Sequence, residues 1–362
     1  MSTIFDPIRI GRIDLATRIC MAPLTRNRAS PGQLPNDLMR QYYQQRANPA
    51  TGAALIITEA SQICPEAQGY LDTPGMFNAE QVAGWRRITE AVHAEGGRIV
   101  IQLWHVGRIS HVSLQPNGQA PVSSTAVAAK GKTYIAGGFA DVSAPRALRS
   151  DELPGIVAQY RQSALLAIEA GFDGVEVHAA NGYLIEQFLR DSINDRTDGY
   201  GGSIPNRTRL LREVMSAVAD AIGGDRTGLR LSPVTPANDA GPDSDPQALY
   251  GHAVAELAPL KLAFLHVVEG ATGGPRDIAP FDYAALRARF TGAWMVNNGY
   301  TRQMALDAVA SGRADLVAFG KPFIANPDLG RRLREDAPWN ALDTKTLYGG
   351  GAAGYTDYPV LD

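Results

Sequence analysis

The segment VEVHAANGY, which spans Val175–Tyr183, joins a strand-like apolar run to a group of reactive polar side chains. Its first residues alternate as in a buried strand, and His178, Asn181 and Tyr183 follow at the expected carboxyl end. In parallel-sheet proteins, ligands bind at the carboxyl ends of the strands. A histidine and an asparagine can hold an anionic or carbonyl oxygen, and a neighbouring tyrosine can supply a proton. The segment therefore indicates chemistry at a carbonyl-activated centre.

Short apolar runs of the same kind recur along the chain and alternate with longer stretches of helical periodicity. The runs are Ile19–Met21, Ala54–Thr58, Ile99–Leu103, Gly174–His178, Gly228–Ser232, Phe264–Glu269, Trp294–Asn297 and Leu316–Phe319. Strands that are mostly followed by amphipathic helices imply parallel pairing through right-handed crossovers. A barrel is the economical closure because it leaves no sheet edge. The sequence thus predicts an α/β fold, a single eight-stranded parallel (β/α)8 TIM barrel that forms one domain over residues 1–362.

Two segments fall outside a bare barrel. Residues 5–15 alternate like a small β-hairpin, which we expect to plug the bottom of the barrel. Residues 104–149 are too long for an ordinary connection and are rich in Gly, Ser, Pro and Ala. Because long connections in compact domains are usually functional, we expect this insertion after the third strand to cap the barrel mouth. Helix-start signals at Asn78, Ser150 and Thr301 support the alternation of strands and helices.

The composition argues against several classes of protein. With 45% hydrophobic and 20% charged residues, the chain can bury a large core. A net charge of -3 gives no electrostatic reason to expect nucleic acid, and there is no apolar run of about 18 residues to indicate a membrane span. The N-terminus lacks the basic and apolar regions of a signal peptide. The two cysteines, Cys20 and Cys64, form no CxxC pattern, so we expect buried thiols in a reducing cytoplasm, and neither a disulfide nor a zinc site.

Alternation along the strands assigns one set of side chains to the barrel interior. The valines of the opening segment fit the helix side of their strand, which turns Glu176 and His178 inward. The same reasoning turns Arg230 inward on a neighbouring strand, and Gln102 and Trp104 on another. Small residues at the end of the second strand leave room for a flat group. Four strands thereby direct side chains to one volume: His178, Arg230, Gln102 and Ala60.

Arg230 needs an electron-rich partner, because a buried guanidinium stays ionised. One interpretation is an ion pair with Glu176 across the barrel. The other is a ligand ring with partial negative charge, which Gln102 would also contact. An isoalloxazine fits the second interpretation, since it is flat, forms hydrogen bonds along one edge and carries negative charge near N1 when reduced.

The last two expected strands end in loops of the kind that bind phosphate in barrels. The seventh is followed by Asn298 and Gly299, and the eighth by Gly320 and Lys321, which offer main-chain N–H groups and a cation. A plain loop would also account for these residues, but a phosphate site beside a flat ring describes FMN. The run Gly349–Gly354 matches G-x-G-x-x-G, yet it lacks the strand, the helix and the later acidic residue of a dinucleotide fingerprint.

A lone histidine at a strand end is more often a core residue than a catalyst. Here Asn181 and Tyr183 follow His178 on the expected functional face, so we interpret it as a ligand contact. The six histidines show no spacing typical of metal ligands, and no metal site is expected.

Further motifs extend along the chain: Met21–Arg26 (MAPLTR), Gln102–Arg108 (QLWHVGR), His178–Tyr183, Asp198–Ser203 (DGYGGS) followed by Asn206 and Arg207, Ala325–Leu329 (ANPDL) and Tyr355–Pro359 (YTDYP). With these motifs the chain resembles the Old Yellow Enzyme family of FMN-dependent ene-reductases, and most of all its bacterial N-ethylmaleimide and nitrate-ester reductases. The resemblance covers essentially the whole chain.

The resemblance implies a role for each matching residue. FMN, bound non-covalently, would be held at its ring by Pro23, Leu24, Thr25, Ala60, Gln102 and Arg230. Its phosphate would be held by Asn298, Gly299, Gly320 and Lys321. The substrate would lie against Trp104, Tyr70 and Tyr355, with its activating oxygen hydrogen-bonded to His178 and Asn181. Tyr183 would deliver the proton.

The implied reaction has two steps. NADPH or NADH reduces the flavin and leaves, and a small activated alkene then binds in the same cavity. Flavin N5 passes a hydride to the β-carbon of an α,β-unsaturated carbonyl compound, maleimide or nitroalkene, while Tyr183 protonates the α-carbon. An alternative at the same site is the reduction of nitrate esters or nitroaromatics, which needs no such proton. Two other classes are a Schiff-base aldolase that uses Lys261 or Lys321, and a non-enzymatic ligand-binding barrel. Either a monomer or a homodimer fits the sequence.

The chain departs from the family pattern at two positions. Lys321 stands where the family commonly has arginine, and a lysine loses the two-pronged grip on phosphate oxygens. Asn181 stands where the bacterial reductases often have histidine. Because an asparagine stays neutral, we expect any pH dependence of substrate binding to come from His178 alone.

Overall fold

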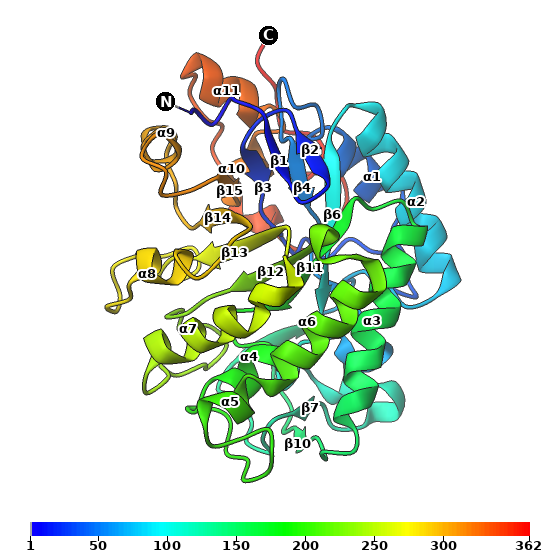
Figure 1. The fold of residues 1–362 in the computed structure, drawn as a ribbon. Helices are drawn as coiled ribbons and strands as arrows, with labels where there is room; N and C mark the ends of the chain where they lie inside the picture. The colour runs from blue at the N-terminus through cyan, green and yellow to red at the C-terminus, as the bar shows by residue number, and fades with distance from the viewer. Residues whose placement is uncertain (1) are drawn as a thin grey trace.

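The computed structural model describes residues 2–362 and contains a closed barrel of eight parallel strands (Figure 1). The strands are β3 (Ile19–Met21), β4 (Leu55–Ile57), β6 (Arg98–Trp104), β11 (Gly174–Ala179), β12 (Thr227–Leu231), β13 (Phe264–Val268), β14 (Ala293–Asn297) and β15 (Leu316–Phe319). Each pairs with its neighbours in this order, and the pairing of β15 with β3 and of β6 with β11 completes the ring. A short strand, β5 (Ser61–Gln62), adds to the carboxyl half of β6. The predicted (β/α)8 barrel is confirmed.

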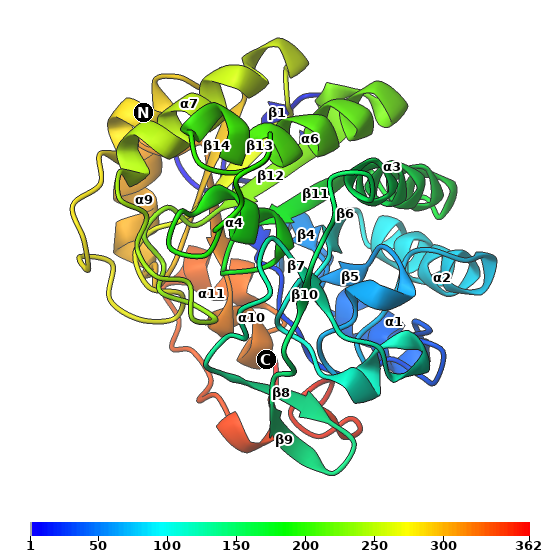
Figure 2. The same ribbon diagram turned by 90° about the horizontal axis from the view of Figure 1, so that it is seen from below.

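Helices cover the outside of the barrel (Figure 2). The main ones are α1 (Asp37–Gln44), α2 (Ala79–Ala94), α3 (Leu153–Glu169), α6 (Arg209–Ile222), α7 (Pro246–Leu257), α8 (Tyr283–Arg287), α9 (Arg302–Ala310) and α11 (Leu329–Glu335). Asn78 and Thr301 cap α2 and α9 as expected, since each side chain accepts a hydrogen bond from a main-chain N–H of the first turn. Ser150 does not cap α3, which starts at Leu153, because its hydroxyl donates to Asp198 instead.

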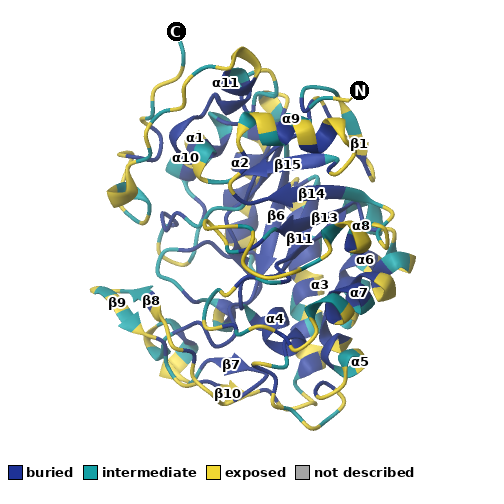
Figure 3. Ribbon diagram, turned by 90° about the vertical axis from the view of Figure 1, so that its left-hand side faces the viewer, coloured by how far each residue is buried: buried dark blue, intermediate teal, exposed yellow. Residues whose placement is uncertain are grey.

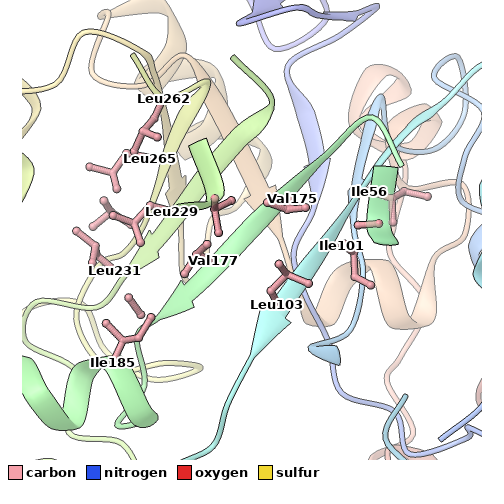
Figure 4. Packing of buried hydrophobic residues seen from close by; sticks show 14 of the residues in the cluster. Ile56, Ile101, Leu103, Val175, Val177, Ile185, Leu229, Leu231, Leu262 and Leu265 are labelled. Atoms are coloured by element: carbon pink, nitrogen blue, oxygen red, sulfur yellow. The ribbon is translucent and has the colours of Figure 1, made fainter. Parts of the chain in front are cut away.

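The barrel strands are buried on both faces (Figure 3), as parallel strands between helices and a filled interior must be. On the helix side, residues such as Val175, Val177 and Leu229 belong to the main core (Figure 4). Each such side chain contributes about 1.5–3 kcal/mol when it is fully buried. The strand faces therefore alternate as predicted, and Glu176, the polar residue between the two valines, points into the barrel.

The N-terminal hairpin closes the bottom of the barrel, as predicted. Strands β1 (Ile8–Ile10) and β2 (Ile13–Leu15) pair in antiparallel fashion. Their side chains share one apolar cluster with inward residues of the barrel, among them Leu55, Val100 and Phe264. The lower half of the interior is consequently a packed core, and only the upper half can hold a ligand.

The insertion after β6 lies at the carboxyl ends of the strands. It contains β7 (Val122–Ser123), the antiparallel pair β8 (Lys132–Ile135) and β9 (Gly138–Asp141), and β10 (Arg146–Ala147). Four of its apolar residues cluster with Ala60 and Trp104: Val106, Ile109, Ala129 and Val142. The β8–β9 hairpin projects beside the C-terminal segment (Figure 2).

Three smaller expectations concern glycines, cysteines and membranes. Gly349–Gly354 forms turns, with neither a preceding strand nor a following helix in the described C-terminal residues, so it is not a dinucleotide fingerprint. Cys20 and Cys64 are unpaired and buried, and burial raises the pKa of both thiols. Between residues 2 and 362, no helix combines the length and the apolar character that a bilayer span requires.

Candidate active site

A cavity of about 560 Å³ opens at the carboxyl ends of the barrel strands. The sequence-predicted residues that line it are Pro23, Leu24, Thr25, Ala60, Gln102, Trp104, His178, Asn181, Tyr183, Arg230, Asn298, Gly299, Gly320 and Lys321. A larger groove of about 1200 Å³ lies between the N-terminal hairpin and α8 and holds none of these residues. We assign the site to the smaller cavity, because buried polar side chains from several strands converge on it.

His178 is a neutral hydrogen-bond donor to this cavity. Burial, reinforced by the positive charge of Arg230 and by His266, lowers its pKa well below 6.5. The main-chain N–H of Ala180 donates to its Nδ1 over 3.3 Å, so Nδ1 is an acceptor. The proton of the neutral ring must therefore sit on Nε2. This differs from the expectation that His178 governs the pH dependence, since its titration lies below the neutral range.

Asn181 stands in a left-handed turn, with φ at 58°, which asparagine tolerates better than most residues. Its main-chain N–H donates to Ser232 Oγ over 2.8 Å, and its main-chain oxygen accepts from Asn238. Its side-chain oxygen accepts a 2.7 Å hydrogen bond from the hydroxyl of Thr272. The amide nitrogen is thereby left as the group that can donate to a ligand.

Tyr183 packs against the other aromatic residues of the wall. Its ring lies 4.9 Å from that of Trp104 and 5.1 Å from that of His178. Its hydroxyl oxygen is 3.1 Å from that of Tyr70, a half-buried residue that is not part of the cavity lining. Burial raises the pKa of Tyr183, so its hydroxyl keeps the proton at neutral pH.

Glu186 holds the turn that carries these groups, and sequence reasoning missed it. This fully buried carboxylate accepts hydrogen bonds from the main-chain N–H of Gly182 and from the hydroxyls of Ser232 and Tyr250. Its charge is balanced by Arg190, one helical turn later, at 2.9 Å. The i,i+4 spacing of a Glu and an Arg directly after the catalytic segment is the signal that could have revealed this support.

The floor of the cavity carries a second polar group. Gln102 Nε2 donates to Glu176 over 2.7 Å, and Glu176 also contacts Nδ1 of His266 over 2.8 Å. Arg230 donates to Asn297 over 3.0 Å and does not pair directly with Glu176. The interpretation of Arg230 as an ion-pair partner of Glu176 is therefore not what the structure contains, although the carboxylate stabilises its charge from a distance.

The loops after β14 and β15 form the far end of the cavity. Asn298 is held by its side chain, which accepts from the N–H of Gly273 and donates to the main-chain oxygens of Glu269 and Ala271. Gly299 has a φ of 65°, and no atom lies within 4 Å of the position that a Cβ would occupy. Lys321 is exposed at the start of α10 (Lys321–Ala325). This end offers open space, main-chain N–H groups and one cation.

The residues of the C-terminal segment that line the cavity differ from the expected Tyr355. Tyr355 is fully buried and stacks on Tyr42 at 4.1 Å, so it does not line the cavity. Leu347 and Tyr348 line it instead. The reason is that the guanidinium of Arg28, 4.3 Å above the Tyr355 ring, keeps this tyrosine in the protein interior. No periodic pattern in this part of the sequence marked Leu347 or Tyr348.

Residues of the cavity fit an FMN ring and phosphate. Arg230 Nε and Trp104 Nε1 are buried polar atoms of cavity residues with no partner among the described residues, so both are free to donate to a ligand. The opposite end has the open glycine and the lysine that a phosphate needs. A metal ion has different needs from FMN. Within residues 2–362, no three side chains of His, Cys, Asp or Glu lie together in a group that could hold one.

Comparisons with known proteins identify the family of the chain. A family model described as the NADH:flavin oxidoreductase / NADH oxidase family matches residues 3–340. The chain is 46% identical to 12-oxophytodienoate reductase 1 of Oryza sativa subsp. japonica, over 99% of this chain and 93% of the relative. It is 43% identical to 12-oxophytodienoate reductase 2 of Arabidopsis thaliana, over 99% and 96% respectively.

Solved structures give the same result. Morphinone reductase in complex with tetrahydroNAD superposes with a TM-score of 0.94 at 46% identity, covering 100% of this chain and 98% of that one. The Old Yellow Enzyme homologue from Zymomonas mobilis superposes with a TM-score of 0.95 at 43% identity, covering 99% of this chain and 100% of the other.

Proposed function

The chain belongs to the NADH:flavin oxidoreductase / NADH oxidase family, in its Old Yellow Enzyme branch, and is an oxidoreductase, and we propose that it is an FMN-dependent ene-reductase. Its substrates are activated alkenes: α,β-unsaturated carbonyl compounds, maleimides and nitroalkenes. The observation that carries this proposal is the convergence of two neutral donors, His178 and Asn181, and one protonated acid, Tyr183, on one cavity.

FMN would bind non-covalently in this cavity. Its ring would be held by Pro23, Leu24, Thr25, Ala60, Gln102 and Arg230, and its phosphate by Asn298, Gly299, Gly320 and Lys321. When bound, FMN supplies a two-electron carrier that takes hydride from NADH or NADPH and returns it to the substrate. The tetrahydroNAD named in the morphinone reductase structure supports a nicotinamide as reductant.

The substrate oxygen binds between His178 and Asn181. Nε2–H of His178 and the side-chain N–H of Asn181 donate to it and stabilise the negative charge that develops there. This polarisation withdraws electron density from the β-carbon, which becomes the site of reduction. Both groups are buried, so water competes little for the oxygen and the hydrogen bonds act in a low dielectric.

Tyr183 delivers a proton to the α-carbon. Its raised pKa keeps the hydroxyl protonated, and the neighbouring Tyr70 hydroxyl can pass on a replacement proton. Reduction of nitrate esters or nitroaromatics requires no such acid, so the paired tyrosines favour alkenes as substrates. Trp104 provides the aromatic wall, and the insertion 104–149 caps the mouth, an assignment supported by its apolar packing on Trp104 and Ala60.

The reductive cycle can be tested on the purified protein in one experiment. Anaerobic titration with NADH or NADPH should bleach a bound flavin, and 2-cyclohexenone should restore its colour far faster than an equal amount of cyclohexanone. A nitrate ester in place of the enone tests the alternative activity. A colourless protein that takes up no FMN would overturn the proposal, and so would a reduced flavin that no activated alkene reoxidises.

A reducing compartment, such as the cytoplasm, suits the unpaired Cys20 and Cys64.

A further inference from the structure

A row of three buried polar residues crosses the barrel interior directly below the cavity. Gln102 on β6, Glu176 on β11 and His266 on β13 have at most 1% of their surface exposed. The pairing of β6 with β11 sets Gln102 beside Glu176 in the sheet. Glu176 spans the interior between the other two, with its Oε1 2.7 Å from Gln102 Nε2 and its Oε2 2.8 Å from His266 Nδ1.

The direction of both hydrogen bonds follows from the chemistry of the three groups. Burial lowers the pKa of His266, which keeps the ring neutral. Its Nε2 has no partner among the described residues, so the ring proton belongs on Nδ1, where it is donated to Glu176. An ionised carboxylate can only accept, and Gln102 must therefore turn its NH₂ group toward Glu176. Glu176 accepts from both neighbours.

This direction decides what Gln102 presents to a ligand. With Nε2 bound to Glu176, the side-chain oxygen is the remaining polar atom of Gln102, and Gln102 lines the cavity. No group in residues 2–362 donates to that oxygen. On the same floor, Arg230 Nε is an unpaired donor. The floor thus offers one acceptor and one donor, a pattern that complements a ring N–H next to a ring acceptor atom.

We propose that Glu176 is a positioning residue that locks the Gln102 amide with its oxygen toward the cavity, so that the floor selects planar rings with an imide-type N–H. The inference rests on the proposed function, in which that ring is the pyrimidine portion of FMN. A purely structural hydrogen bond between Glu176 and Gln102 would stabilise the barrel but would impose no such selection.

Substitution of the carboxylate by its own amide separates these two roles. In Glu176→Gln the new amide can still accept from His266, and its NH₂ group then faces Gln102. Gln102 must rotate to accept, which turns its NH₂ group toward the ring N–H. We expect FMN to bind about 10- to 100-fold more weakly, because two donors would then face each other without water. The measurement is quenching of flavin fluorescence on titration of the apoprotein with FMN.

The more specific readout is the discrimination between FMN and N3-methyl-FMN, which lacks the imide N–H. Wild-type protein should prefer FMN by about 10-fold or more, and Glu176→Gln should lose most of this preference. The exchange variant Glu176→Gln with Gln102→Glu keeps one amide and one carboxylate in the row. It again presents an acceptor oxygen to the cavity, so the preference for FMN should return.

A matched control is Thr89→Val, which removes a buried hydrogen bond to Ala170, outside the cavity. It should leave the FMN preference unchanged, and thermal unfolding checks the folding of every variant. An unchanged preference in Glu176→Gln, or an exchange variant that does not recover it, overturns the inference. If Glu176→Gln does not fold, two other variants test the inference. The exchange variant should keep the preference for FMN, and Gln102→Leu should lose it although Glu176 is intact. Wild-type protein that binds no FMN overturns the proposed function instead.

Discussion

The hydroxyl oxygens of Tyr70 and Tyr183 lie 3.1 Å apart, and of the two residues only Tyr183 lines the cavity. Burial raises the pKa of both phenols, so both stay protonated over the neutral range. One hydroxyl can then donate outward to a substrate while it accepts from the other. The pair is suited to deliver one proton and to replace it.

Replacement of Tyr183 by phenylalanine should separate the two half-reactions. Tyr183→Phe removes the proton donor, so reoxidation of the reduced enzyme by 2-cyclohexenone should slow by about 10²- to 10⁴-fold. Flavin reduction by nicotinamide needs no proton from this residue and should change less than about threefold. Stopped-flow absorbance measures both rates. Tyr70→Phe serves as the control, with a smaller loss in the alkene step, and equal losses in both half-reactions would remove Tyr183 from its assigned role.

Buried neutral histidines should make the protein less stable in mild acid. Burial lowers the pKa of His105 to about 3 and that of His178 well below 6.5, so below pH 6.5 the unfolded chain binds protons that the folded chain does not. Burial raises the pKa of Glu59 to about 7, so as the pH falls the folded chain takes up a proton at Glu59 before the unfolded chain does. This uptake opposes the effect of the histidines on stability. Up to two protons from the histidines, less nearly one from Glu59, leave a net difference that grows to about one proton near pH 5, or about 1.4 kcal/mol of unfolding free energy lost per pH unit there. Urea unfolding of the holoenzyme between pH 7 and 5 tests this, and a stability that increases toward pH 5 contradicts it.

The barrel was predictable because each strand is a short apolar run between turn signals, and because parallel strands bring their carboxyl ends together. That rule alone placed Arg230 beside His178, two residues far apart in the chain. The sequence placed the start of α3 in the segment 150–153, where it lies, but Ser150 does not cap the helix, for a local reason. A serine hydroxyl can satisfy a helix N–H or a distant carboxylate, and only the folded chain brings Asp198 within reach.

The site was predictable where residues follow a strand and was missed where they come from loops. Thr272, Leu347 and Tyr348 line the cavity, yet no strand or helix pattern fixes their direction. Tyr355 was expected in the wall because of its motif, but its position depends on cation–π contacts with Arg26 and Arg28. Contacts between segments more than three hundred residues apart leave no periodic signal in the sequence.

Thr272 should control the second hydrogen bond to the substrate oxygen. Its hydroxyl donates to the Asn181 side-chain oxygen over 2.7 Å and so keeps the amide nitrogen free to donate to the substrate. Thr272→Val should raise the KM for 2-cyclohexenone about three- to tenfold, the value of one hydrogen bond, while Thr272→Ser should stay near wild type. Because the effect acts through Asn181, Thr272→Val should cost nothing further in an Asn181→Ala background. Additive losses in that double variant would show that Thr272 acts independently.

Lys321 should limit the affinity for FMN. Its ammonium is a point charge at the phosphate end of the cavity, where a guanidinium could bind two oxygens at once. Lys321→Arg should lower the FMN dissociation constant by about three- to tenfold, and Lys321→Met should raise it about tenfold or more. Both constants can be measured from flavin fluorescence at low ionic strength, and the difference should shrink as salt is added. Equal affinities for all three proteins would mean that this residue does not contact the phosphate.

Arg28 should hold the part of the C-terminal segment that reaches the cavity. It donates to the main-chain oxygens of Gly351 and Thr346 over 3.0 Å each, and no carboxylate within residues 2–362 forms an ion pair with it. A lysine at this position keeps the charge but cannot bind several carbonyls in a plane. Arg28→Lys should therefore accelerate amide hydrogen exchange of residues 346–354 by about tenfold or more, since a lost charged hydrogen bond is worth about 1.5–3 kcal/mol. Tyr348 lies on this segment, so the KM for bulky enones should change while flavin reduction stays the same. Arg87→Lys, at an exposed ion pair on the protein surface, is the matched control, and equal exchange rates in the two variants would argue against this role for Arg28.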